Sequence, residues 1–112
     1  MKNNLKKQNK KIYMVVGMYE TNTQGEKEYQ EKVKEFKVIK EDKERYVMKI
    51  ENELYRLIMK KELKTIYEFS LENELVFYTY CIKKDLNMIK NAIKDIVELN
   101  QRKEGKVWIE KI

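Results

Sequence analysis

Residues 33–51 read VKEFKVIKEDKERYVMKIE, and this stretch alternates between apolar and charged side chains as strands do. Apolar side chains recur at every second position on both sides of the charged segment 41–44, which is typical of half-buried strands. These apolar residues are Phe36 and Val38 before the segment and Tyr46, Met48 and Ile50 after it. The pattern predicts two antiparallel strands joined by a hairpin loop at residues 41–44.

A further strand is expected before this hairpin. Residues 12–19, IYMVVGMY, form a nearly continuous apolar run, which is typical of a strand covered on both faces. Gly17 inside the run indicates a β-bulge or a close approach of another part of the chain. Residues 21–25, TNTQG, then predict a turn or an exposed loop.

A repeated segment predicts two more turns. The sequence ENEL occurs at residues 51–54 and again at residues 72–75, each time between apolar, strand-like runs. Asn tolerates left-handed backbone angles, so Asn52 and Asn73 are suited to hairpin turns. The strands of the second hairpin are expected at residues 65–71 and 75–82.

After Asp85 the hydrophobic period changes from two residues to three or four, which predicts an amphipathic helix over residues 85–103. Asp85 suits the N-cap, and Gly105 suits the position just beyond the C-terminal end. Residues 106–109 are expected to form a short closing strand. The apolar positions of the helix are Leu86, Ile89, Ile93, Ile96 and Val97.

Together these elements predict an α+β protein: an antiparallel curled sheet or small SH3-like barrel of five to seven strands with one C-terminal amphipathic helix. An open sheet packed on the helix is the alternative. Residues 1–11 are expected to be a flexible basic tail, and residues 12–112 a single α+β domain. We expect one core cluster, made of Tyr46, Met48, Ile50, Leu57, Phe69, Leu71, Phe77, Leu86, Ile89, Ile93 and Ile96.

The composition argues against catalysis. The 112-residue chain has no His, which removes the commonest general base and the commonest metal ligand. Its three glycines are too far apart for a phosphate-binding loop, and its acidic clusters lack the spacing of a calcium loop. We therefore expect no enzyme activity, no catalytic residues, no metal site and no cofactor.

Cysteine use and hydropathy predict a cytoplasmic protein. Cys81 is the only cysteine and lies in an apolar strand, which favours a buried, inert thiol in a reducing compartment. The apolar run at residues 12–19 follows several lysines, but it is too short to span a membrane, and no small-residue cleavage site follows it. No membrane partner is expected.

The net charge of +6 lies almost entirely at the N-terminus, because residues 1–11 hold five Lys and no acidic residue. The rest of the chain is nearly neutral, so the basic composition describes a tail rather than a basic domain. A nucleic acid could bind this tail and the polar face of the helix through Lys2, Lys6, Lys7, Lys10, Lys11, Lys90 and Lys94. A solubilising tail and a solvated helix face are the plainer alternatives.

Aromatic side chains offer a second contact for nucleic acid. Tyr67 and Phe69 share one face of their strand, and so do Tyr78 and Tyr80. Aromatic rings on an exposed sheet face with basic neighbours can stack single-stranded bases. Packing in the core is the favoured interpretation for both pairs.

Binding to a protein is supported by the strand pattern. The strands of residues 33–51 carry charged stripes that could meet a complementary surface, through Lys34, Lys37, Arg45 and Lys49. Residues 75–82 carry apolar side chains on both faces of the expected strand. One face of this strand can therefore meet the helix, while the other needs a barrel interior or a partner.

Residues 34–50, KEFKVIKEDKERYVMKI, continue into LIMKKEL at residues 57–63, and the strand of residues 78–80 and the Asp-initiated helix follow. With this pattern, residues 12–103 resemble the small proteins of bacteriophages and integrating elements. The use of 22 Lys against three Arg, together with Asn and Ile, is typical of an AT-rich genome. The resemblance implies a mobile-element setting, and the size and charge density are similar to those of phage inhibitors such as anti-CRISPR proteins.

We therefore expect a non-enzymatic phage or mobile-element protein that inhibits or modulates a host nucleic-acid-handling or defence complex by stoichiometric binding. Its partner would be a host protein or ribonucleoprotein complex. The first alternative is a DNA- or RNA-binding accessory protein that uses the Lys tail and a helix or sheet face. The second is an assembly protein that oligomerises through a sheet edge, and the oligomeric state is left open.

Overall fold

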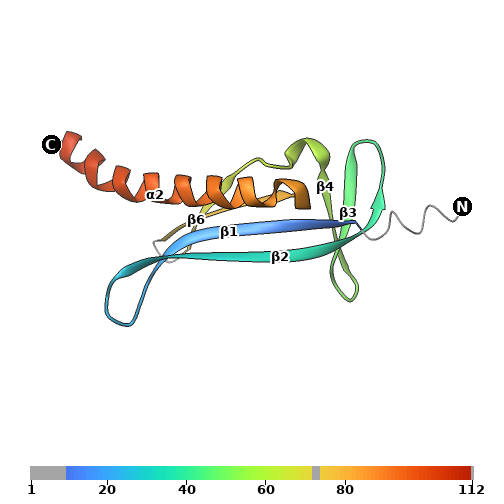
Figure 1. Ribbon diagram of the computed structural model, residues 1–112, viewed down its shortest axis with the longest axis horizontal. Coiled ribbons are helices and arrows are strands. Elements are labelled where there is room, and N and C mark those ends of the chain that lie inside the picture. Colours follow the sequence, from blue (N-terminus) through green and yellow to red (C-terminus); the bar gives the residue numbers. More distant parts are fainter. Residues whose placement is uncertain (1–9, 72–73, 112) are drawn as a thin grey trace, which may run out of the picture.

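The computed structural model describes residues 10–71 and 74–111, which form one antiparallel sheet followed by one α-helix (Figure 1). The strand order is β4-β3-β2-β1-β6-β5. The elements along the chain are β1 (Lys11–Thr21), β2 (Lys27–Glu41), β3 (Arg45–Glu51), β4 (Leu54–Met59), the 3-10 turn η1 (Lys60–Glu62), β5 (Tyr67–Leu71), β6 (Glu74–Cys81), the 3-10 turn η2 (Lys83–Asp85) and α2 (Leu86–Lys111). The predicted α+β class is confirmed, and the sheet is a curled half-barrel whose two edges are β4 and β5.

The long β1–β2 hairpin is the centre of the sheet. Its register runs without interruption from Lys11 opposite Lys37 to Thr21 opposite Lys27. The turn is held by the Asn22 side chain, whose Oδ1 accepts backbone hydrogen bonds from residues 24 and 26, each at 2.9 Å. Strand β2 begins six residues earlier than the predicted start at residue 33, because pairing with β1 stabilises a charged segment that has little strand character of its own.

The other predicted hairpins are also present. Residues 42–44 join β2 to β3, and Asn52 lies in the short turn between β3 and β4. Strands β5 and β6 pair as an antiparallel hairpin with Tyr67 opposite Tyr78. The turn predicted at Asn73 lies outside the described residues.

The sheet curls toward one face, so that β4 approaches β6 although three strands separate them in the sheet order. Arg56 of β4 donates a hydrogen bond to the Tyr80 hydroxyl of β6 at 3.2 Å, and the backbone N–H of Lys64 donates to the Tyr80 carbonyl at 2.8 Å. Figure 1 shows β3 and β4 running across the direction of β1 and β2. The concave face encloses a first core cluster of Ile12, Phe36, Val38, Tyr46, Met48, Ile58 and Tyr80.

Helix α2 covers the convex face over β1 and β6, the two strands that it contacts (Figure 1). The second core cluster lies between them and contains Tyr13, Val15, Phe77, Cys81, Ile89, Ile93 and Val97. Gly17 permits the close packing, since a Cβ atom there would collide with Ile93 and would lie 2.7 Å from the Tyr29 hydroxyl. Of the two roles considered for Gly17, the close approach is therefore confirmed, and the β1–β2 register shows no bulge at this position.

The prediction of a single core cluster is wrong. The two clusters lie on opposite faces of the sheet, because β1 and β6 carry apolar side chains on both faces and each face has its own cover. Two residues assigned to the core are largely exposed: Leu57 at 47% and Phe69 at 45%. The side chain of Leu71 is not among those that the structure describes.

The predicted C-terminal end is also wrong. Helix α2 continues through Gly105 to Lys111, and residues 106–109 are helical rather than a closing strand. One Gly inside a helix costs only about 1 kcal/mol, and helical hydrogen bonds satisfy the backbone without a neighbour.

The sheet begins earlier than the predicted boundary between tail and domain. Lys11 is the first residue of β1, and the Lys10 carbonyl accepts a hydrogen bond from the backbone N–H of Val38 at 3.0 Å. The tail predicted at residues 1–11 therefore overlaps the sheet at its last two residues. Among the described residues, α2 included, no helix is long and apolar enough to cross a lipid bilayer.

Candidate interaction surface

A row of three lysines crosses the convex face of the sheet. Lys11 of β1 lies opposite Lys37 of β2, and Lys37 lies opposite Lys49 of β3. Residues directly opposite each other on neighbouring strands project their side chains from the same face, with Cβ atoms about 5 Å apart. All three residues are exposed. We call Lys11, Lys37 and Lys49 the lysine row.

The lysine row is only partly neutralised within the protein. Glu35 pairs with Lys11 at 2.9 Å, and this pair raises the pKa of the Lys11 ammonium. Within residues 10–71 and 74–100, no carboxylate lies within 4.0 Å of Lys37 or Lys49. Like charges directly opposite each other on a sheet are destabilising. The row thus holds positive charge that an external anion would relieve.

Apolar side chains lie beside the lysine row. Tyr55 of β4 lies opposite Lys49 and is 49% exposed. The neighbouring row joins Lys40, Val47 and Leu57, and Leu57 is also about half exposed. Because α2 covers β1 and β6, this part of the convex face over β2, β3 and β4 is free of the helix (Figure 1).

A lysine-rich cleft adjoins Lys11. The cleft has a volume of about 500 Å³ and is lined by Lys10, Lys11, Tyr13, Tyr46, Ile82, Lys83 and Lys84. Turn η2, between β6 and α2, supplies Lys83 and Lys84, and both are exposed. We call this the lysine cleft. Since Lys11 belongs to both features, the row and the cleft form one basic surface.

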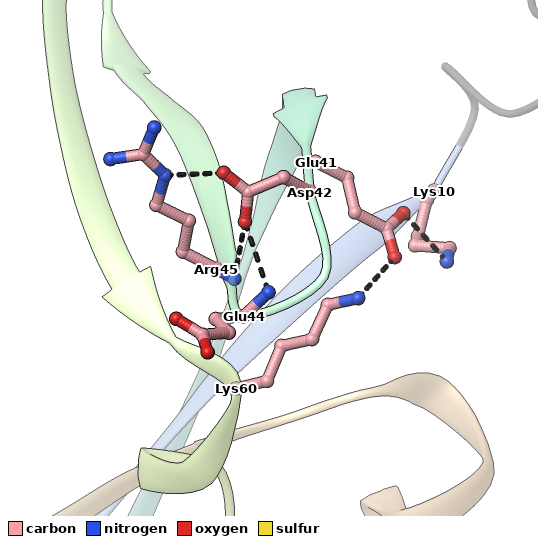
Figure 2. A network of polar contacts seen from close by, with 6 residues as sticks. All are labelled: Lys10, Glu41, Asp42, Glu44, Arg45 and Lys60. Carbon is pink, nitrogen blue, oxygen red and sulfur yellow. Dashed lines mark hydrogen bonds and ion pairs between the residues drawn. The ribbon is translucent and has the colours of Figure 1, made fainter.

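Other charges of this region are paired within the protein, as Figure 2 shows. Glu41 accepts hydrogen bonds from Lys60 at 2.6 Å and from Lys10 at 3.0 Å, and the Lys60 contact is the main cause of its lowered pKa. The same pairing raises the pKa of Lys10. Both ammonium groups also lie over the Tyr46 ring, at 4.9 Å for Lys60 and 5.5 Å for Lys10. This network fastens η1 and the start of β1 to the β2–β3 hairpin.

The hairpin loop has its own ion pair. Asp42 Oδ1 accepts backbone hydrogen bonds from Glu44 and Arg45, each at 3.0 Å, while Oδ2 pairs with the Arg45 Nε at 2.6 Å (Figure 2). The Arg45 contact is the largest cause of the lowered pKa of Asp42. The Arg45 side chain therefore serves the loop and is less available to a partner than the lysine row.

The structure separates the four residues predicted to bind a protein partner. Lys37 and Lys49 are neighbours in the lysine row, and Arg45 lies on the same face but pairs with Asp42. Lys34 lies on the concave face, with its Nζ 5.5 Å from the centre of the Phe36 ring. The sequence alone could have placed Lys34 beside Phe36, because side chains alternate along a strand and residues two apart share a face.

The residues predicted to bind nucleic acid are also separated. Lys10 and Lys11 line the lysine cleft, whereas Lys2, Lys6 and Lys7 lie outside the described residues. On the helix, Lys90 pairs with Glu31 at 3.4 Å, and Lys94 lies over the Tyr29 ring at 6.0 Å. These two helix lysines lie over the β1–β2 hairpin, apart from the lysine row.

Burial raises the pKa of two side chains, the fully buried Cys81 and the half-buried Tyr29. Burial raises the pKa of the Cys81 thiol to about 11, with a smaller contribution from Asp85. Burial likewise raises the pKa of Tyr29 to about 12. The thiolate is the nucleophilic form of cysteine, so a thiol with this pKa is not activated for catalysis.

Within the described part of the chain, no group of three or more acidic or cysteine side chains is placed to hold a metal ion. The chain matches no protein family, no curated protein and no solved structure. The described residues thus form a basic surface, made of the lysine row and the lysine cleft, with the exposed Tyr55 and Leu57 beside it.

Proposed function

We propose that this protein binds nucleic acid stoichiometrically, without catalysis, through the lysine row and the lysine cleft. The observation that carries the proposal is the register that sets Lys11, Lys37 and Lys49 side by side on three strands. The lysines at residues 2, 6 and 7 precede this surface in the chain and add three positive charges. A cytoplasmic location fits both such a ligand and the single, buried Cys81.

Phosphate groups suit this surface because a lysine ammonium binds phosphate as a point charge. Contacts of this kind release counterions, so the affinity falls steeply as the salt concentration rises. The row lies on a rigid sheet, and the lysines therefore lose little backbone freedom on binding. Nothing in this surface is arranged to break a bond, since its side chains are lysines, aromatic rings and one aliphatic residue.

The experiment that tests this proposal measures the binding of a fluorescent oligonucleotide by anisotropy over a range of salt concentrations. The full chain is compared with a variant lacking residues 2–9, which keeps Lys10 and the complete lysine row. We expect the truncated variant to bind more weakly but to remain salt-dependent. Binding that disappears with residues 2–9 would assign the affinity to the tail and contradict the proposal.

A second candidate is the inhibition of a host nucleic-acid-handling or defence complex by binding an acidic protein surface. The exposed Tyr55 and Leu57 beside the lysine row favour it, because aromatic and apolar side chains form the centre of protein interfaces. The resemblance to small phage and mobile-element proteins is the other support.

The two candidates differ in what Leu57 does. An inhibitor of this kind would titrate its target near one copy per complex, and Leu57→Ser would weaken inhibition while leaving oligonucleotide affinity unchanged. A Leu57→Ser variant that inhibits as well as the parent protein would count against the protein-binding candidate. Turnover at substoichiometric protein would count against both.

A further inference from the structure

Three aromatic side chains gather on the concave face, on the opposite side of the sheet from α2. The ring centre of Tyr78 lies 5.4 Å from that of Tyr67 and 5.8 Å from that of Phe69. Tyr67 and Phe69 come from the edge strand β5, and Tyr78 from its neighbour β6. We call Tyr67, Phe69 and Tyr78 the aromatic face.

The aromatic face lies toward the uncovered end of the concave surface. At the covered end, the β3–β4 hairpin contributes Met48 and Ile58 to a cluster in which Ile12 is fully buried. Further along, Tyr67 and Tyr78 are only half-buried, and Phe69 is 45% exposed. A large aromatic ring at the sheet edge therefore presents its surface to solvent.

The register places basic side chains on the same face. Tyr67 lies opposite Tyr78, which lies opposite Val16, which lies opposite Lys32. Lys34 follows two residues after Lys32 on β2, and both lysines are exposed. Two strand spacings, about 10 Å, separate Tyr78 from Lys32. The distance between a base and its own phosphate, added to the length of a lysine side chain, spans this gap. Lys32 and Lys34 can therefore contact the phosphates of bases that stack on the rings.

This arrangement fits a single-stranded nucleic acid. Unpaired bases can stack on exposed aromatic rings, whereas the bases of a duplex are already stacked on one another and cannot reach them. Positive charge beside the rings suits the phosphates that connect such bases. The neighbouring Val16 and Met18 of β1 are half-buried and apolar, which also suits the flat face of a base.

The geometry points to the aromatic face as a stacking platform for the unpaired bases of single-stranded nucleic acid, with Lys32 and Lys34 holding the phosphates. This inference rests on the proposed function and names its ligand as a single strand. The lysine row and cleft on the other surface supply the general affinity for polyanions. The aromatic face then supplies the preference for strands whose bases are free.

The test compares three fluorescent probes of equal length: single-stranded oligothymidylate, a duplex and an abasic single strand that lacks bases. The full chain should bind oligothymidylate more tightly than the abasic strand. Phe69→Ala should lower oligothymidylate affinity by about 5- to 100-fold, as expected for one lost base–ring stack. It should leave duplex and abasic affinity unchanged, and Phe69→Tyr should restore the loss.

Leu99→Ala is the control and should leave the affinity for every probe unchanged, because Leu99 is an apolar residue of similar exposure (55%) on α2, away from the aromatic face and the lysine row. Far-UV circular dichroism confirms that each variant is folded. Equal affinity for oligothymidylate and the abasic strand, or no effect of Phe69→Ala, would overturn the stacking platform. That result would leave the proposed function intact if Lys37→Gln with Lys49→Gln still weakened all probes. The same result is expected if the aromatic face binds a protein partner instead. Failure to bind any probe would contradict both the stacking platform and the proposed function.

Discussion

Gly17 of β1 lies directly beneath Ile93 of α2, so close that no Cβ atom fits between the strand and the helix. Ile93 is completely buried in the cluster that joins α2 to β1 and β6. The helix therefore packs against backbone rather than against a side chain at this point. This contact fixes the distance between the helix and the sheet.

Gly17→Ala should destabilise the protein by about 1–3 kcal/mol, because an added methyl group overpacks the contact with Ile93. Ile93→Ala should cost about 2–5 kcal/mol through the cavity that it leaves. Urea unfolding followed by circular dichroism measures both. In the double variant, the cost of Gly17→Ala should shrink, since the colliding methyl group of Ile93 is gone. Strict additivity of the two changes would show that the helix does not dock as described.

Glu41 should give the protein an acid-sensitive contribution to stability. The fold lowers the pKa of this carboxyl below its ordinary value of 4.5, mainly through Lys60 and then Lys10. The stabilisation is therefore present above pH 4.5 and is lost as the pH falls through the lowered pKa. Glu41→Gln should cost about 1 kcal/mol or less near neutral pH, because the pair is partly exposed. The difference in unfolding free energy should vanish in acid, and a difference that persisted there would exclude the ion pairs as its source.

Cys81 should resist thiol reagents in the folded protein. Its side chain is fully buried, and its pKa of about 11 leaves very little thiolate near neutral pH. Iodoacetamide should alkylate it quickly in urea and very slowly in native buffer, as mass spectrometry can follow. Rapid modification of the native protein would mean that α2 opens away from β6.

Much of the fold follows from local patterns in the sequence. The parts that could not be predicted are those that tertiary contacts determine. Alternation around residues 41–44 and the change of period at Asp85 each mark an element directly. The early start of β2 could not be seen, because its charged first half is held by pairing with β1. The extension of α2 beyond Gly105 could not be seen either, because a Gly that suits the end of a helix is also tolerated inside one at a cost of about 1 kcal/mol.

The candidate site was less accessible to sequence reasoning. Lys37 and Lys49 were predicted to bind a partner, but their position beside Lys11 depends on a register that alternation alone does not set. The same applies to the aromatic face, which unites Tyr67 and Phe69 with Tyr78 across two strands. Lys84 and Tyr55 carried no sequence signal, since only the folded sheet brings them beside the other lysines.

Glu35 should weaken the binding of nucleic acid, because its carboxylate forms an ion pair with Lys11 in the free protein. Glu35→Gln should release Lys11 and raise oligonucleotide affinity by at most about fivefold, the range expected for an exposed ion pair. Glu31→Gln is the matched control, because it removes the same charge from the same strand but frees Lys90 of the helix. Equal gains from both variants would reflect net charge alone and would argue against a role for Lys11.

If nucleic acid binds the lysine row, the salt dependence of oligonucleotide affinity must change when charge is removed from the row. Lys37→Gln with Lys49→Gln removes two charges from the row, whereas Lys90→Gln with Lys94→Gln removes two from the helix. For a single strand, loss of two phosphate contacts should reduce the slope of log affinity against log salt concentration by about 1.4. We predict this reduction for the row variant and an unchanged slope for the helix variant. Equal slopes in both variants and the parent protein would show that nucleic acid does not contact the lysine row.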